Sequence, residues 1–168
     1  MNEKTRFASA TTHDQFREIA QLAREIWTEH YTPIIGSAQV AYMLDKFQSE
    51  AAIKEQVDEG VLYYLIKYDG APAGYVSVYK KNTALFLSKF YVHKSMRGKG
   101  IGKLALGLVQ QKAVEMDCDR IALTVNKHNT GSIKAYDKLG FENKGPVVID
   151  IGEGFIMDDF AFEKKISN

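Results

Sequence analysis

A cluster of glycines and cations in the middle of the chain has the composition of an anion-binding loop. The segment Lys94–Lys103 reads KSMRGKGIGK and contains three glycines and four cations, with no acid among them. Glycines let the backbone approach a ligand closely. A helix that begins at such a segment directs unpaired N–H groups and the positive end of its dipole toward the ligand. The segment therefore predicts a site for a polyanion, with a pyrophosphate as the best match.

Two common phosphate-binding motifs do not fit this segment. A Walker A loop that ends at Gly102–Lys103 needs glycine where Arg97 stands and a hydroxyl residue where Leu104 stands. A dinucleotide fingerprint that starts at Gly98 needs its third glycine at position 103, which is a lysine. The pattern that remains is Arg-x-x-Gly-x-Gly over Arg97–Gly102. Taken alone, it is equally compatible with an ordinary glycine-rich turn before a helix.

A second pattern follows downstream of this loop. Leu123–Asn129 ends a predicted strand, and Ser132, Tyr136 and the triplet Leu139–Phe141 come after it. The order Asn-x-x-Ser-x-x-x-Tyr-x-x-x-Gly-Phe, downstream of Arg-x-x-Gly-x-Gly, resembles the GNAT superfamily of N-acetyltransferases. The resemblance extends over essentially the whole chain. Three further segments resemble the bacterial spermine/spermidine acetyltransferase branch: Leu87–Val92, Leu123–Lys127 and Asp150–Asp159.

The resemblance implies an α/β (α+β) GNAT fold in a single domain over residues 1–168. We expect a mixed, mostly antiparallel central sheet of about seven strands with helices on both faces. It also implies acetyl-CoA as cosubstrate, with no metal, and a pantetheine arm that lies along one strand edge while the glycine loop holds the pyrophosphate. The residues expected to bind acetyl-CoA are Tyr91, Val92, Arg97, Gly98, Lys99, Gly100, Ile101, Gly102, Lys103, Asn129 and Ser132.

Two of the motif residues have a second interpretation. Asn129 matches the family asparagine that contacts the pantetheine arm, but it is equally well placed to cap the helix that begins near Thr130. Tyr136 is the predicted general acid, because a phenol with a pKa of about 10 can protonate the departing CoA thiolate. Its alternative is a core tyrosine, since Ile133 and Tyr136 share one face of the predicted helix.

The acceptor side is less well defined by the resemblance. Glu29, Tyr31 and Asp150 are the predicted substrate-binding residues, and the first two helices and the last hairpin are expected to form the pocket. The general base stays open among several groups, because Lys89 lies near the place where many family members carry an acid. The candidate bases are Glu29, His30, Tyr31, His93 and a water that relays to Asp150. Six acids are either an acidic wall of this pocket or solvated, with Asp150 and Asp159 then as turn and strand-end groups: Glu25, Glu29, Asp150, Glu153, Asp158 and Asp159.

Three functions are compatible with these motifs. We expect transfer of an acetyl group to a primary amine by direct attack in a ternary complex, with a small amine or polyamine favoured as acceptor. Acetylation of peptide or protein N-termini or lysines is the second possibility. The third is a module that binds acetyl-CoA without turnover.

Composition argues against several other classes. The chain has 168 residues and a net charge of +1, so no strong overall field favours nucleic acid or an anionic membrane. The four histidines are scattered, and Cys118 is the single cysteine and stands between two acids, which argues against metal, disulfide and thiolate chemistry. No signal peptide or membrane span is expected, so a cytoplasmic location is the prediction. The final hairpin is a candidate edge for a homodimer.

Periodicity predicts the elements that must position these residues. Thr12 and Gln15 form a capping box before an amphipathic helix that is expected to end at Thr32–Pro33. Asp69–Gly70 predicts a hairpin turn. A second helix is expected over 37–59, and two more over 101–116 and 132–139. Strands are predicted over 5–10, 61–68, 73–80, 83–93, 120–126, 145–151 and 155–164.

Overall fold

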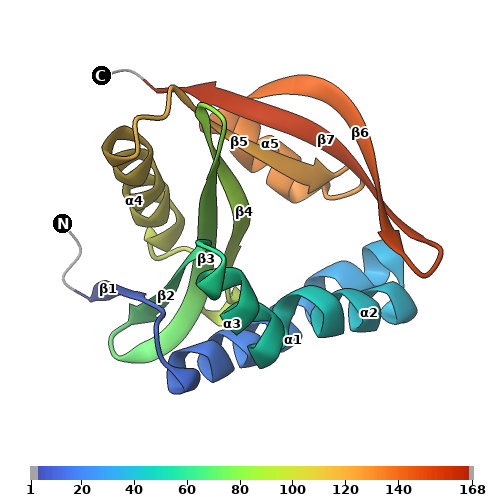
Figure 1. The fold of residues 1–168 in the computed structure, drawn as a ribbon, viewed down its shortest axis with the longest axis horizontal. Coiled ribbons are helices and arrows are strands. Elements are labelled where there is room, and N and C mark those ends of the chain that lie inside the picture. The colour runs from blue at the N-terminus through green and yellow to red at the C-terminus, as the bar shows by residue number, and fades with distance from the viewer. Residues whose placement is uncertain (1–3, 167–168) are drawn as a thin grey trace. The chain divides into compact units, whose positions relative to one another are not determined.

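The computed structural model describes residues 4–166. Its strands follow one another in the order β1-β2-β3-β4-β5-β7-β6 (Figure 1). The pairing of β4 with β5 is parallel, whereas β1/β2, β2/β3, β5/β7 and β6/β7 are antiparallel. The predicted mixed, mostly antiparallel sheet of seven strands is therefore confirmed. The strands are β1 (Thr5–Ser9), β2 (Leu62–Tyr68), β3 (Ala71–Lys81), β4 (Ala84–Val92), β5 (Arg120–Asn126), β6 (Glu142–Gly152) and β7 (Phe155–Lys165).

The helices differ from the prediction in two places. The first helix, α1 (His13–Ile35), continues through Pro33 and ends at Gly36, whose φ of 88° leaves the helical region. Proline's fixed φ is itself helical, so the helix can continue through Pro33, although the N–H that would bond the carbonyl oxygen of Glu29 is missing. The predicted single helix over 37–59 is two helices, α2 (Ser37–Gln48) and α3 (Glu50–Asp58), because Ser49 adopts an extended ψ and caps α3 through Ala52 N–H.

The other predicted elements are present, with some ends shifted: β6 begins at Glu142 instead of 145, and α5 begins at Thr130 instead of 132. The capping box of Thr12 and Gln15 is present at the start of α1. Asp69 and Gly70 both have positive φ, as a tight hairpin turn between β2 and β3 requires. Three further helices are η1 (Lys94–Met96), a single 3-10 turn, α4 (Ile101–Glu115) and α5 (Thr130–Lys138).

The chain forms two compact units, and each is described by itself. The first unit takes in the residues up to Tyr79 together with Lys89–Leu108. In it, α1 lies alongside α2 (Figure 1) and also contacts α3 and β2. On β4, the ring of Tyr91 packs against Trp27 of α1, whereas the ring of Phe90 faces Gly102 of α4. Consecutive strand residues point to opposite faces, so helices cover both faces of the sheet here.

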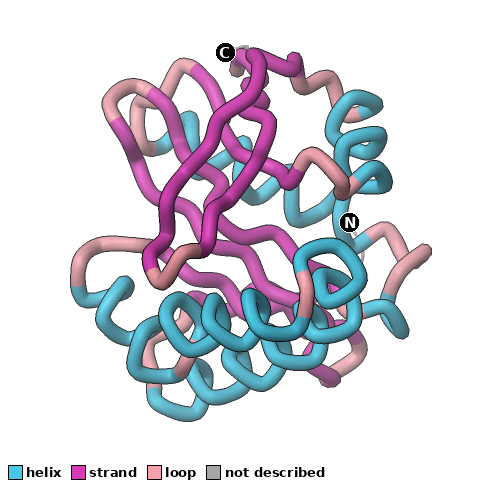
Figure 2. The backbone as a smooth tube through the Cα atoms, turned by 90° about the vertical axis from the view of Figure 1, so that its right-hand side faces the viewer, coloured by secondary structure: helices cyan, strands magenta, loops and turns pink. Residues whose placement is uncertain are grey.

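The second unit takes in Lys80–Ser88 and the chain from Val109 onward. In this unit β6 and β7 form one long antiparallel hairpin (Figures 1 and 2), and β7 also pairs with β5 over its whole length. The parallel register between β4 and β5 joins Ala84 to Arg120 and runs to Phe86 and Ala122. Leu123, Phe141 and Phe162 are buried in this unit.

Candidate active site

The predicted anion-binding loop has an open backbone that suits a phosphate ligand. Gly98 and Gly100 have φ values of 79° and 78°, and a Cβ at either position would meet no atom within 4 Å. Directly after them α4 begins at Ile101, which is buried and anchors the helix start. The first N–H groups of a helix have no intrahelical acceptor, so they are available to an anion. This geometry fits a pyrophosphate.

The cations of the loop divide into paired and exposed groups. Lys94 Nζ lies 3.2 Å from Glu29 Oε1 of α1. Arg97 Nε donates to the carbonyl oxygen of Val92 at 3.4 Å. Lys99 Nζ lies 5.2 Å above the ring of Tyr68 and remains exposed. Lys99 and Lys103 are therefore the cations of this loop that are best placed to neutralise phosphates.

Glu29 belongs to a small hollow beside the loop. The hollow has a volume of about 200 Å³ and is lined by Ile26, Glu29, His30, His93, Lys94 and Arg97. His93 bonds two neighbours there. Its Nε2 lies 3.3 Å from Glu25 Oε2, and its Nδ1 lies 2.8 Å from Ser95 Oγ. Because Lys94 and His93 partner the acids of α1, these acids offer less free negative charge than the predicted acidic wall requires.

An aromatic cluster joins α1 to the end of β4. The hydroxyls of Tyr31 and Tyr91 lie 3.1 Å apart, and the ring of Trp27 packs edge-on against both rings. Beneath them, Tyr75 donates a hydrogen bond of 2.6 Å to Gln48 Oε1, and burial raises the pKa of this phenol well above 10. The structure thus places two predicted residues, Tyr31 and Tyr91, side by side, and Trp27 beside them is buried in the core.

Lys89 has an environment that disfavours its charged form. It lies on β4 two residues before Tyr91, so the two side chains leave the strand on the same face. Burial of the ammonium lowers the pKa of Lys89 from 10.5 to about 8. Many family members carry an acid near this position. In this chain Lys89 instead provides an amine that is partly neutral near physiological pH, and it lies next to the aromatic cluster.

In the second unit, Tyr136 lies on α5, and Asn129 is the N-cap of that helix. The ring of Tyr136 packs against Phe141 and Phe162, with centroids 5.4 and 6.4 Å away, and the residue is only half-buried. Asn129 is buried, and its Oδ1 accepts a hydrogen bond from Ser132 N–H at 3.4 Å. The capping role of Asn129 is therefore confirmed, while its contact with pantetheine stays a prediction.

The predicted acids of the last hairpin have unlike surroundings. Asp150 is exposed, and its carboxylate accepts a hydrogen bond from Gly152 N–H at 2.8 Å, which is a turn interaction. Asp158 forms an ion pair of 2.8 Å with Lys127. Asp159 is only 3% exposed, and burial raises its pKa from 3.8 to about 6. The sequence left Asp159 open between an acidic wall and a strand-end group, because neither periodicity nor spacing reveals that this strand position is covered.

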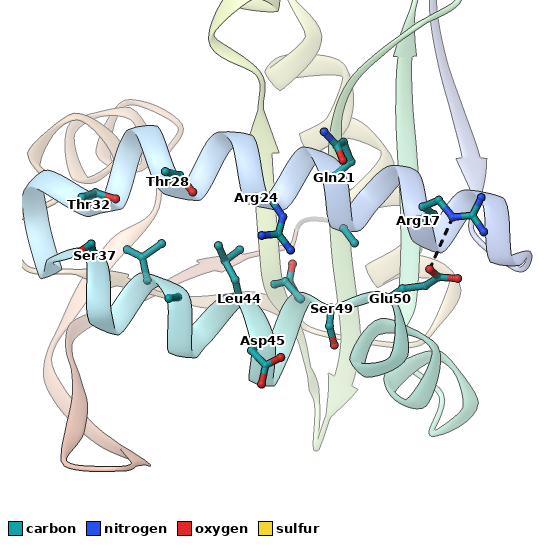
Figure 3. Close-up of a pocket in the computed structure, with 14 residues that line it drawn as sticks. Arg17, Gln21, Arg24, Thr28, Thr32, Ser37, Leu44, Asp45, Ser49 and Glu50 are labelled. Carbon is teal, nitrogen blue, oxygen red and sulfur yellow. Dashed lines mark ion pairs between the residues drawn. The ribbon is translucent and has the colours of Figure 1, made fainter.

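A separate groove runs between α1 and α2 (Figure 3). It has a volume of about 610 Å³, with Thr32 and Ser37 at one end and the ion pair of Arg17 Nε with Glu50 Oε2, 3.8 Å, at the other. None of the predicted acetyl-CoA or substrate residues is among those that line it. The groove is therefore a feature of the paired helices and is distinct from the glycine loop.

Three further observations concern metals, membranes and thiols. Over residues 4–166, the histidines, cysteine and acids form no group that could hold a metal ion. Within the same range, no helix has both the length and the apolar character that a bilayer span requires. Burial raises the pKa of the Cys118 thiol, and the charges of Asp119 and Asp117 add to this rise, while Lys80 opposes it, so the predicted lack of thiolate reactivity is supported.

Comparisons with known proteins agree with this arrangement. A probable spermine N(1)-acetyltransferase of Bacillus subtilis subsp. natto is 36% identical over 66 residues, which cover 39% of this chain and 43% of that protein. The match thus spans less than half the length of this relative. N-alpha-acetyltransferase 30 of Dictyostelium discoideum is 26% identical over 156 residues, 84% of each chain. The crystal structure of the PaiA N-acetyltransferase from Thermoplasma acidophilum in complex with coenzyme A has a TM-score of 0.79 at 18% identity and covers 96% of this chain and 98% of that one.

A family-level match covers both motifs of the chain. The sequence profile of the Acetyltransferase (GNAT) family matches residues 16–141, a range that includes most of α1, the glycine loop, β5 and Tyr136. It therefore contains both motifs from which the resemblance was inferred. The chain belongs to the GNAT family of acetyltransferases.

Proposed function

We propose that the protein is an acetyl-CoA-dependent N-acetyltransferase that transfers the acetyl group to a primary amine by direct attack in a ternary complex. The observation that carries this proposal is the open backbone at Gly98 and Gly100 directly before the start of α4. Such a loop offers several N–H donors and a helix dipole to a pyrophosphate. Membership of the GNAT family supports the same ligand.

Acetyl-CoA supplies a thioester, and the chain's own residues hold it. The backbone of Tyr91 and Val92 is the proposed edge for the pantetheine arm, and the backbone from Arg97 to Lys103 is the proposed cradle of the pyrophosphate. On α5, Asn129 and Ser132 are the proposed contacts of the arm. The Asn129 amide can serve both purposes, since its Oδ1 caps the helix and its Nδ2 remains a donor.

Tyr136 is the proposed general acid. Attack by a neutral amine gives a tetrahedral species, and its collapse releases CoA thiolate, which needs a proton. The ring of Tyr136 is held by Phe141 and Phe162, while the residue keeps part of its surface exposed. A phenol that is fixed by its ring and still accessible is suited to donate a proton to a sulfur without moving.

A small amine or a polyamine is the proposed acceptor. The similarity to a probable spermine N(1)-acetyltransferase supports this class. Acetylation of peptide N-termini is the second candidate, supported by the longer but weaker similarity to N-alpha-acetyltransferase 30. Glu29, Tyr31 and Asp150 stay the proposed substrate contacts, although the pairing of Glu29 with Lys94 weakens its contribution.

The deciding experiment is thiol release from acetyl-CoA with a panel of acceptors. Spermidine, spermine, putrescine, free lysine and short peptides with a free N-terminus are supplied to the purified protein. Acceptor-dependent thiol release supports acetyl transfer, and the best acceptor identifies the class. Tight binding of acetyl-CoA without release to any acceptor supports the non-catalytic module, and absence of binding contradicts the proposal altogether.

The role of Tyr136 has a direct test. We expect Tyr136→Phe to lower kcat about 100-fold, within the range that general acid catalysis contributes, while the affinity for acetyl-CoA is retained. The matched control is Tyr42→Phe, which removes the hydroxyl of a tyrosine on α2 that contacts Lys46. If Tyr136→Phe turns over within threefold of the unmodified protein, the assignment is wrong and Tyr136 is a packing residue.

A homodimer through β6 stays a prediction. This strand is the last in the strand order, and Val148 on β6 and Ile156 on β7 are 61% and 49% exposed. Exposed apolar residues at a sheet edge favour edge-to-edge pairing. Sedimentation of the protein and of Val148→Lys distinguishes a dimer that uses this edge from a monomer.

A further inference from the structure

Gln48 is a buried polar residue at the end of α2. It is 2% exposed, although glutamine usually lies at the protein surface. It belongs to the first compact unit, as do Tyr31 and Tyr91, the proposed contacts of the acceptor and of the pantetheine arm. A buried amide costs free energy unless its hydrogen bonds are made, and an apolar side chain of the same length avoids this cost. The partners of the amide therefore indicate what it does.

The Gln48 amide makes three hydrogen bonds. Its Nε2 donates to the carbonyl oxygen of Phe47 at 2.6 Å and to the hydroxyl of Tyr63 at 3.0 Å, so both amide hydrogens are used. Its Oε1 accepts from the hydroxyl of Tyr75 at 2.6 Å. Tyr63 on β2 and Tyr75 on β3 are 1% and 0% exposed, and burial raises the pKa of both phenols. Gln48 therefore ties the end of α2 to two strands of the sheet.

Gln56 of α3 shares two of these partners. Its Nε2 donates to the Phe47 carbonyl oxygen at 2.8 Å, and its Oε1 accepts from the Tyr63 hydroxyl at 2.6 Å. The Phe47 carbonyl lies in the last turn of α2, where backbone acceptors lack an intrahelical donor. Both glutamines thus stabilise the junction between α2 and α3. Of the two, Gln48 is the one that accepts from Tyr75.

Tyr75 connects this network to the proposed active site. Its ring packs against the ring of Tyr91, with centroids 5.5 Å apart. The hydroxyl of Tyr91 lies 3.1 Å from that of Tyr31, and these two side chains are called the tyrosine pair below. The backbone of Tyr91 has a separate support, because its carbonyl oxygen lies close against Gly74 of β3. The side chains of the tyrosine pair therefore depend on Tyr75, whereas the strand edge proposed for pantetheine does not.

We propose that Gln48 is a positioning residue of the acetyl transfer: by holding Tyr75, it orients the tyrosine pair, at which the acceptor amine binds. This inference rests on the proposed function. Gln48 is not a catalytic residue, because it acts on the pair through Tyr75. The alternative is a residue that only stabilises the junction of α2 with α3. That alternative applies equally to Gln56, so the two glutamines can be compared directly.

Gln48→Met and Gln56→Met form a matched pair of variants. Each removes one amide from the junction and leaves one buried hydroxyl without its acceptor, that of Tyr75 in the first variant and that of Tyr63 in the second. Methionine is unbranched and adaptable, so it can fill the space of either glutamine. Both variants should lose stability, because an unsatisfied buried donor is costly. Gln48→Met alone also loses the bond that holds Tyr75.

The first test is the KM of each variant for the best acceptor. We expect Gln48→Met to raise this KM about tenfold, as the loss of one hydrogen bond can do, while kcat and the affinity for acetyl-CoA stay within about threefold. Gln56→Met should leave the acceptor KM within about threefold of the unmodified protein. Urea unfolding of both variants shows that they are compared as folded proteins. A rise of the acceptor KM in both variants, or in neither, would overturn the proposal.

Tyr75→Phe keeps the test decisive if Gln48→Met folds poorly. It removes the same hydrogen bond from the other side and leaves no buried donor without an acceptor, since Gln48 still donates to Phe47 and Tyr63. Tyr75→Phe should raise the acceptor KM to the same extent as Gln48→Met. The double variant should raise it no further, because the two residues act as one unit. A double variant whose effect is the product of the two single effects would contradict action through Tyr75.

The fluorescence of Trp27 gives a second readout that does not depend on turnover. Trp27 is the single tryptophan of the chain, and its ring packs edge-on against both members of the tyrosine pair. Gln48→Met should change its emission spectrum in the folded protein, and Gln56→Met should not. Unchanged emission in Gln48→Met would overturn the proposal. Absence of turnover by the unmodified protein with every acceptor would instead contradict the proposed function, and the emission spectra would still decide whether Gln48 orients the pair.

Discussion

At the scale of single residues, the burial of Asp159 predicts a measurable effect on stability. Its pKa is 3.8 in the unfolded chain and about 6 in the folded protein, so the folded state prefers the protonated acid. The stability contributed by this group is complete below pH 3.8 and is lost as the pH rises through 6. The loss amounts to about 3 kcal/mol at full ionisation, by the free-energy equivalent of a pKa change.

Asp159→Asn should therefore unfold at higher urea concentration than the unmodified protein at pH 8, because the amide stays neutral and can still accept from Thr124. At pH 4 the two proteins should have nearly equal stability. Urea unfolding at both pH values measures this difference. Equal stability at pH 8 would show that the folded protein compensates the charge of Asp159.

Residue identity and residue environment were not equally accessible from the sequence. Arg97, Gly100, Asn129 and Tyr136 were found because their spacing is a local pattern along the chain. The burial of Asp159 depends on which face of β7 it occupies and on what lies over that face, so no local pattern contains it. The pairing of Glu29 with Lys94 depends on tertiary contact in the same way.

At the scale of secondary-structure elements, the approach of β3 to β4 depends on Gly74. A Cβ at this position would overlap the carbonyl oxygen of Tyr91, which belongs to the strand edge proposed for pantetheine. We expect Gly74→Ala to destabilise the protein by about 1–3 kcal/mol, as overpacking does, and to weaken acetyl-CoA binding as well. The matched control is Gly107→Ala.

Gly107 lies within α4, and a Cβ there would meet no atom within 4 Å. An alanine inside a helix is favoured over glycine by about 1 kcal/mol, so this control should stabilise the protein. Thermal unfolding and acetyl-CoA titration of both variants measure the contrast. If Gly74→Ala is as stable as Gly107→Ala, then β3 and β4 can move apart without a free-energy cost. The close contact of Gly74 with the Tyr91 carbonyl would then not fix the strand edge proposed for pantetheine.

Most elements were predictable because their signals are local. Thr12 with Gln15 begins α1, and the positive φ of Asp69 and Gly70 agrees with the predicted hairpin. The errors have local causes as well. Pro33 was taken as the end of α1, although a proline with helical φ can stay in the last turns. Ser49 was taken as a helix interior residue, although serine competes effectively as an N-cap and divides the segment into α2 and α3.

At the scale of the whole molecule, the charge is nearly balanced, with 22 basic and 21 acidic residues. Such a chain attracts an anionic ligand only weakly from a distance. Affinity for acetyl-CoA must therefore come from groups that contact it. Because Lys94 pairs with Glu29 and Arg97 donates to the Val92 carbonyl, Lys99 and Lys103 are the loop cations left to act on the phosphates.

This distribution predicts a localised salt dependence. Replacing both Lys99 and Lys103 by Gln should weaken acetyl-CoA binding about five- to thirtyfold at 50 mM KCl, since each exposed pair contributes roughly 0.5–1 kcal/mol. The effect should become small near 500 mM KCl, where the charges are screened. The matched control replaces Lys134 and Lys138 on α5, which changes the net charge equally. If both double variants lose affinity to the same extent, the overall charge governs binding and the glycine loop does not hold the phosphates.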